Sequence, residues 1–136
     1  MNSDLLAQEL ERDEGKKNML YRDSLGIWSI GVGRNLQDRG LSDDEILYLL
    51  KNDMNIVFAA LDTSLPWWRA MTENRQRVLA NMCFNLGINR LMGFKNTLLS
   101  MSQGDYAAAA AGMLASRWAT QVGDRATRLA AMMEQG

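Results

Sequence analysis

Residues 43–61 form the segment that most limits how this chain of 136 residues can fold. Ser42-Asp43-Asp44-Glu45 has the pattern of a capping box, which begins a helix. Apolar residues then recur over an arc of that helix that is broader than the face one lobe would cover. They are Ile46, Leu47, Leu49, Leu50, Met54, Val57, Phe58 and Leu61. We therefore expect residues 43–61 to be a helix that links two lobes.

The segment before this helix predicts a first helix followed by a β-hairpin. Ser3 can cap a helix that runs to Glu14 and ends at Gly15, the residue type that favours a left-handed stop. Asp23 and Gly26 occupy the first and fourth positions that a type I turn favours. The hairpin would thus begin a few residues after the helix ends.

The strand after the turn alternates between apolar and small residues, as a half-buried strand does. Trp28, Ile30 and Val32 are the apolar set, and we expect them to face inward. The other set is Ser29, Gly31 and Gly33, which we expect to leave an open surface.

Residues 62–136 predict a bundle of helices. Helical segments are expected at 72–86, 95–102, 105–115 and 124–133, separated by Gly, Asp and Ser residues. The sequence therefore predicts a mostly helical α+β fold in one domain, 1–136. Its parts are an N-terminal hairpin lobe at about 13–45, a linking helix at about 43–61, and a helical lobe at about 62–136 that includes the first helix.

Two absences in the composition restrict the chemistry. The chain has no histidine, so acid–base catalysis near neutral pH would fall to carboxylates, Lys, Tyr or the lone Cys83. With one cysteine and no histidine, we expect no disulfide framework, no metal site and no cofactor. No apolar run has membrane-spanning length, and the first residues lack a signal-peptide pattern.

Charge is distributed unevenly along the chain. Residues 1–64 carry 12 acidic and 7 basic side chains, whereas residues 65–136 carry 4 acidic and 8 basic ones. A basic C-terminal half fits an anionic polymer such as cell-wall glycan or nucleic acid, and it also fits ordinary solvated faces. The basic half lacks the clustered Lys/Arg run interleaved with aromatics that nucleic-acid binders show, so we expect no nucleic-acid partner.

Glu14 and Asp23 sit in environments that suit different tasks. Glu14 shares a helical stripe with Leu6 and Leu10, which predicts partial desolvation, as a proton donor needs. Asp23 begins an exposed turn, where backbone N–H groups can hold its carboxylate. Ser29, on the following strand, adds a hydroxyl that could orient a water molecule. Two carboxylates in unlike environments are what glycosidic bond cleavage requires.

At these positions the chain resembles the bacteriophage lysozymes of the T-even type. That family carries Glu, eight residues, Asp, five residues and Thr, and Glu14, Asp23 and Ser29 keep both spacings. Further segments resemble the family in order along nearly the whole chain. They are Asp13-Glu14-Gly15, Tyr21-Arg22-Asp23, Ser29-Ile30-Gly31-Val32-Gly33, Asn81 to Gly87, Gly93 to Leu98 and Ser116-Arg117-Trp118.

The resemblance implies a lysozyme-like two-lobed fold and a muramidase. Such an enzyme would hydrolyse the β-1,4 bond between N-acetylmuramic acid and N-acetylglucosamine in peptidoglycan, with inversion. Glu14 would protonate the leaving oxygen, Asp23 would stabilise positive charge on the sugar and help to place the water, and Ser29 would hold that water.

Three further residues are implied by the same resemblance. Leu36 follows the hairpin and would line the cleft. Asn85 falls where the family has a substrate-facing Gln. Arg125 matches a family arginine that pairs with the catalytic Glu.

The chain departs from the family pattern at three places. Ser29 replaces Thr, which keeps the hydroxyl but loses the methyl group that restricts its rotamer. Arg34 stands where the family often has His. The segment 34–41 is shortened, and we expect it to lack a strand or loop.

The resemblance also implies a biological setting. The protein would be a monomeric endolysin that accumulates in the host cytoplasm and lyses the wall from the periplasm after a pore-forming holin admits it, without inserting stably into the membrane itself. Two alternatives stay open: a lytic transglycosylase acting on the same bond, and a non-catalytic wall-binding or virion module.

Overall fold

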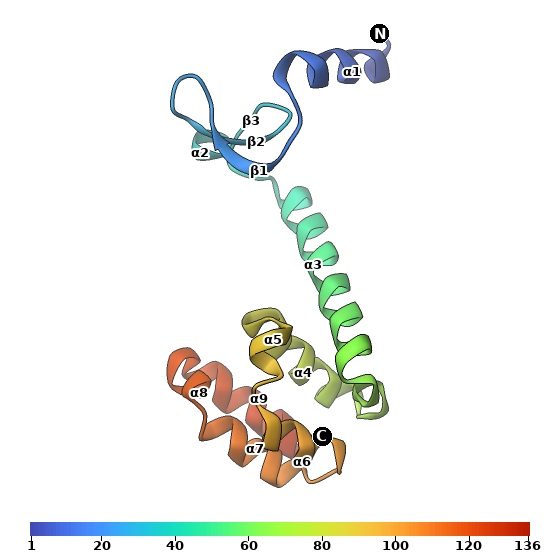
Figure 1. The fold of residues 1–136 in the computed structure, drawn as a ribbon, viewed down its shortest axis with the longest axis vertical. Helices are drawn as coiled ribbons and strands as arrows, with labels where there is room; N and C mark the ends of the chain where they lie inside the picture. The colour runs from blue at the N-terminus through green and yellow to red at the C-terminus, as the bar shows by residue number, and fades with distance from the viewer. The chain divides into compact units, whose positions relative to one another are not determined.

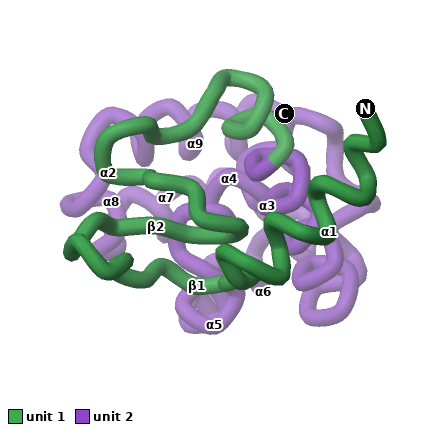
Figure 2. Tube along the Cα trace, turned by 90° about the horizontal axis from the view of Figure 1, so that it is seen from above, with its two compact units in different colours: residues 1–48 green, residues 49–136 purple.

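A computed structural model describes all residues, Met1–Gly136. The chain forms two compact units, Met1–Tyr48 and Leu49–Gly136, which Figure 2 distinguishes by colour. The boundary lies inside α3 (Asp43–Ser64), one long helix that begins where the capping box predicts (Figure 1). The predicted fold class, mostly helical α+β with a small antiparallel sheet, is confirmed. The assignment of the first helix to the helical lobe stays a prediction.

Unit 1 contains a helix, a three-stranded sheet and a one-turn helix before α3 begins. These elements are α1 (Ser3–Glu14), β1 (Lys17–Arg22), β2 (Trp28–Gly31), β3 (Arg34–Asn35) and α2 (Leu36–Arg39). The strands are antiparallel in the order β1-β2-β3. The N-cap of α1 is Asn2, whose Oδ1 accepts the Leu5 N–H at 3.0 Å, and not Ser3 as the sequence suggested.

The shortened segment 34–41 keeps a strand. The sequence predicted a two-stranded hairpin, and Arg34–Asn35 adds a third strand by pairing with β2 as β3. The loss of a strand or loop relative to the family stays a prediction. Asn35 then caps α2 by accepting the Asp38 N–H at 2.9 Å. The turn between β2 and β3 is tight, since Ile30 is paired with Arg34.

The predicted inward face of β2 is wrong. Ser29 is only 2% exposed, whereas Trp28 is 38% and Val32 42% exposed. Val32 lies in the turn after β2, and the guanidinium of Arg22 stacks on Trp28 at 4.4 Å from the ring centroid. Alternation predicts that the two faces of a strand differ, but which face becomes covered depends on the elements that pack on it.

Arg34 ties the sheet to the start of α3. Its guanidinium forms an ion pair with Glu45 at 2.6 Å and donates to the Gly40 carbonyl at 3.2 Å. Glu45 also accepts the Ser42 N–H at 2.8 Å, which completes the capping box. These bonds lower the pKa of Glu45 from 4.5 to about 2, first through Arg34 and then through Ser42.

Removing the Glu45 charge should therefore have an effect that depends on pH. A lowered folded-state pKa adds stability above the unfolded value of 4.5, and that stability is lost as pH falls from 4.5 through about 2. We expect Glu45→Gln to lower the Tm near pH 7, although its amide oxygen can still accept the Ser42 N–H. The Tm difference from wild type should disappear near pH 2, as thermal unfolding followed by circular dichroism would show. A difference that is constant with pH would contradict the ion-pair contribution.

Unit 2 is entirely helical. Besides the remainder of α3, its elements are η1 (Pro66–Ala70), α4 (Glu73–Leu86), α5 (Ile88–Leu91), α6 (Lys95–Ser102), α7 (Tyr106–Leu114), α8 (Arg117–Val122) and α9 (Asp124–Gln135). The helix α7 packs against both α6 and α9, and α9 also packs on α4. None of the helices is both long and apolar enough to cross a bilayer.

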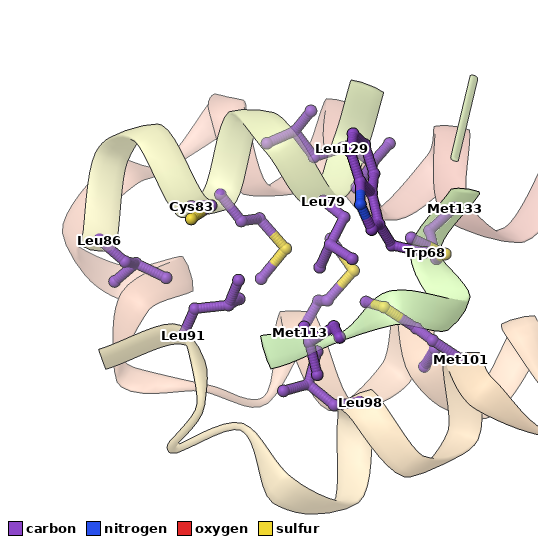
Figure 3. Close-up of a cluster of buried hydrophobic side chains, with 14 of the residues drawn as sticks. Trp68, Leu79, Cys83, Leu86, Leu91, Leu98, Met101, Met113, Leu129 and Met133 are labelled. Atoms are coloured by element: carbon purple, nitrogen blue, oxygen red, sulfur yellow. The ribbon is translucent and has the colours of Figure 1, made fainter. Parts of the chain in front are cut away.

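The hydrophobic core lies in unit 2, where every buried apolar residue falls between Val57 and Met133. Figure 3 shows side chains from η1, α4, α5, α6, α7 and α9 converging on one another, among them Trp68, Leu79 and Met113. Cys83 belongs to this core, and burial raises the pKa of its thiol, so it behaves as a small apolar residue. Ser29 is the only buried residue of unit 1.

Candidate functional site

Glu14 is the last residue of α1. The helix ends because Gly15 adopts φ +80° and donates its N–H to the Glu11 carbonyl at 2.9 Å. The chain then enters β1, and Lys17 pairs with Gly31 at the far end of β2. This register brings the end of α1 to the turn between β2 and β3. The Glu14 carboxylate lies against Gly33 of that turn.

The stripe that was expected to desolvate Glu14 is open in the structure. Glu14 is exposed, and Leu6 and Leu10 are 40% and 45% exposed. The sheet of unit 1 does not cover this face of α1, because β1 turns away after Gly15 and pairs with β2 instead. The predicted partial desolvation of Glu14 is therefore not supplied by unit 1 itself.

Asp23 is held by the backbone of the turn that it begins, as predicted. Its Oδ1 accepts the N–H groups of Leu25 and Ile27 at 2.8 and 2.9 Å. Its carbonyl accepts the Gly26 N–H, and its own N–H donates to the Ile27 carbonyl, both at 2.9 Å. The carboxylate is thus fixed through one oxygen, and Oδ2 is left for another partner.

Ser29 is fixed by the same residue that holds Asp23. Its hydroxyl donates to the Ile27 carbonyl at 3.2 Å. Because the proton is directed at Ile27, the oxygen can offer a further partner only its lone pairs. Because Ser29 is only 2% exposed, its predicted role of holding a water molecule stays a prediction.

The remaining predicted residues are divided between the units. Leu36 begins α2 in unit 1 and is partly buried. Asn85 lies in α4, where its Oδ1 accepts the Trp118 Nε1–H at 2.9 Å. Arg125 lies in α9 and donates twice to Asn81 Oδ1, at 2.9 and 2.8 Å. Within unit 1, Glu14 lies at the turn after β2, whereas Asp23 and Ser29 are held at the turn before it. The substrate contacts of Leu36 and Asn85, and the pairing of Arg125 with Glu14, stay predictions.

Unit 2 has a cationic hollow of its own beside α6 and α8. It has a volume of about 660 Å³ and is lined by the cations Arg90, Lys95 and Arg117 together with the buried Trp118. Such a lining suits a ligand that carries carboxylates. No group of three or more Cys, Asp or Glu side chains lies together in a way that could hold a metal ion.

Gly33 is the residue that reading the sequence missed. The sequence predicted that Gly33 lies on an open strand face, but it lies in the turn after β2 with φ +65°. A Cβ at this position would collide with the Glu14 carboxylate. The pattern Gly31-Val32-Gly33 does signal a tight turn, since both glycines adopt positive φ. The approach of Glu14 follows from the strand register and has no local sequence signal.

Comparisons with known proteins relate the chain to lysozymes. Residues 11–134 match the model of the family described as phage lysozyme. The chain is 24% identical to probable T4-type lysozyme 2 of Dictyostelium discoideum, over 96% of this chain and 94% of that protein. It is 31% identical to the SAR-endolysin of Escherichia phage Mu, over 90% of this chain and 70% of that protein. It is also 24% identical to the pre-baseplate central spike protein Gp5 of Enterobacteria phage T4, over 28% of that protein.

Proposed function

We propose which bond this chain cleaves and with which stereochemistry, since it belongs to the phage lysozyme family and is therefore a glycoside hydrolase of peptidoglycan. The bond is the β-1,4 linkage from N-acetylmuramic acid to N-acetylglucosamine, and it is cleaved with inversion at the anomeric carbon. The family resemblance of the sequence is confirmed.

The observation that carries this proposal is the arrangement of three side chains in unit 1. Glu14 ends α1 at the β2–β3 turn, while Asp23 and Ser29 are both held by Ile27 on the β1–β2 turn. An exposed carboxylic acid and a separately fixed carboxylate are the two groups that glycoside hydrolysis needs. Ser29, although only 2% exposed, adds a hydroxyl that can accept a hydrogen bond from the attacking water.

Each side chain then has one role. Glu14 protonates the glycosidic oxygen as the bond to the anomeric carbon breaks. Asp23, through its free Oδ2, stabilises the positive charge that develops on the sugar and helps to place the water. Ser29 holds that water. The hydroxyl is the part of the family threonine that this role needs, so Ser29 retains hydrolysis.

The charge of unit 2 supports a peptidoglycan substrate. Peptidoglycan carries carboxylates on its peptide stems, and the hollow near Trp118 presents Arg90, Lys95 and Arg117. We assign to the enzyme a role in bacterial wall lysis as an endolysin, reaching the periplasm from the host cytoplasm through a separate pore-forming protein. The similarity to a phage protein named SAR-endolysin supports the lytic role.

Analysis of the products tests the proposal. Purified peptidoglycan digested with the enzyme should yield muramic acid ends that borohydride reduces, and NMR of fresh digests should show the α-anomer first. In water enriched in heavy oxygen, the label should appear at the new reducing end. Products that are lighter by one water, with anhydromuramic ends and no reducing terminus, would instead identify a lytic transglycosylase. No change in the polymer would identify a non-catalytic wall-binding or virion module.

A further inference from the structure

We propose that Gly33 is a positioning residue for Glu14, and that the absence of a side chain at Gly33 is what allows the acid to rest against the β2–β3 turn. The inference rests on the proposed function, because it concerns the alignment of the proton donor. Catalysis would then depend on Gly33 in addition to Glu14, Asp23 and Ser29.

The contact is specific to one glycine. A Cβ built on Gly33 would lie 2.9 Å from Glu14 Oε2, 3.2 Å from its Cδ and 3.4 Å from its Cγ. Real Cβ atoms essentially never approach another heavy atom as closely as 2.9 Å, so any side chain at position 33 must displace the carboxylate. The other glycines of unit 1 would place a Cβ in open space, with nothing within 4 Å; they are Gly15, Gly26, Gly31 and Gly40.

The turn that carries Gly33 is anchored on both sides. Lys17 pairs with Gly31, which links the turn to the chain just after α1. On the other side, Ile30 pairs with Arg34, whose guanidinium binds Glu45 and the Gly40 carbonyl. The turn therefore cannot easily move aside to accommodate a methyl group. Glu14 moves instead, because a carboxylate at the end of a flexible side chain is cheap to displace.

Displacing the carboxylate should slow the chemical step more than it weakens binding. A misplacement of about 1 Å in a catalytic group can cost about 100-fold in rate. Substrate contacts made elsewhere are unaffected, so the change is expected in kcat and not in KM.

Gly31→Ala is the matched control for Gly33→Ala. Both glycines lie at the same turn with nearly equal backbone angles, φ +68° at Gly31 and φ +65° at Gly33. An alanine at either position is strained to a similar degree by the positive φ, so the Tm of the two variants should fall by similar amounts. They differ in what the new methyl group meets, which is open space at 31 and Glu14 at 33.

The experiment measures kcat and KM of wild type, Gly33→Ala and Gly31→Ala on soluble peptidoglycan fragments, well below each Tm. We expect Gly33→Ala to lower kcat by about 10- to 100-fold and Gly31→Ala to stay within about twofold of wild type. In NMR spectra of carboxyl carbons, the Glu14 signal should move in Gly33→Ala and keep its position in Gly31→Ala.

Two results separate failure of the inference from failure of the proposed function. If wild type hydrolyses peptidoglycan and Glu14→Gln does not, equal kcat values for the two alanine variants would overturn the positioning role alone. An unmoved Glu14 signal in Gly33→Ala would do the same without reference to activity. If wild type releases no reducing ends, the proposed function fails first and this inference falls with it.

Discussion

Replacing Glu14 with glutamine should abolish peptidoglycan hydrolysis while leaving the fold intact. Glutamine has nearly the same shape but no proton to give to the leaving oxygen, and general acid catalysis contributes about 10²- to 10⁴-fold to a rate. Glu14 is exposed at the C-terminal end of α1, where the helix dipole disfavours a negative charge. The Tm should therefore stay the same or rise slightly. A turbidity assay on cells stripped of their outer membrane, with circular dichroism for the fold, checks both expectations.

Glu11→Gln is the matched control for this substitution. Glu11 is an exposed residue of the same helix, so the variant makes the same change in net charge without touching the proposed acid. We expect Glu11→Gln to lyse cells at close to the wild-type rate. Lysis that survives in Glu14→Gln would show that another group supplies the proton, and comparable losses in both variants would point to charge and not to proton transfer.

Replacing Leu79 with alanine should give the largest loss of stability, about 2–5 kcal/mol. Leu79 lies in α4 with none of its surface exposed, and Figure 3 places it among side chains from several helices. The substitution removes buried methyl groups and leaves a cavity that close-packed neighbours fill only in part. Urea unfolding followed by tryptophan fluorescence measures the effect, since Trp68 and Trp118 are both buried in the same unit.

Leu25→Ala provides the comparison for Leu79→Ala. Leu25 lies at the tip of the β1–β2 turn and is 82% exposed, so its replacement should change the free energy of unfolding by no more than about 0.5 kcal/mol. The contrast follows from where the core lies, because unit 1 buries no apolar residue. Similar losses in the two variants would mean that Leu25 is covered in solution.

Both ends of α4 were predictable from the sequence, because each cap is encoded locally. Thr72 caps α4 by accepting the Arg75 N–H, and Gly87 ends that helix, both as expected. Three short α-helices were missed, α2 and α5 with four residues each and α8 with six, because such lengths hold too little periodicity to detect. In α8 a local signal was present, since Ser116 accepts the Ala119 N–H at the N-cap.

The candidate site was predictable in part for the same reason. The turn that holds Asp23 is local, and its hydrogen bonds to Leu25 and Ile27 follow from residue types within five positions. The inward-facing side of β2 was predicted wrongly, because Trp28 stays 38% exposed with the Arg22 guanidinium stacked on its ring. The contact between Glu14 and Gly33 joins residues that only the pairing of Lys17 with Gly31 brings together. Contacts of this kind depend on register, which no single segment encodes.

Ile27 offers its N–H to Asp23 and its carbonyl to Ser29, so one residue of the backbone sets both groups. An insertion or deletion between positions 23 and 29 would therefore displace the Asp23 carboxylate and the Ser29 hydroxyl together. Anyone who grafts new loops onto this scaffold to retarget it should leave that stretch at its present length and choose other connections.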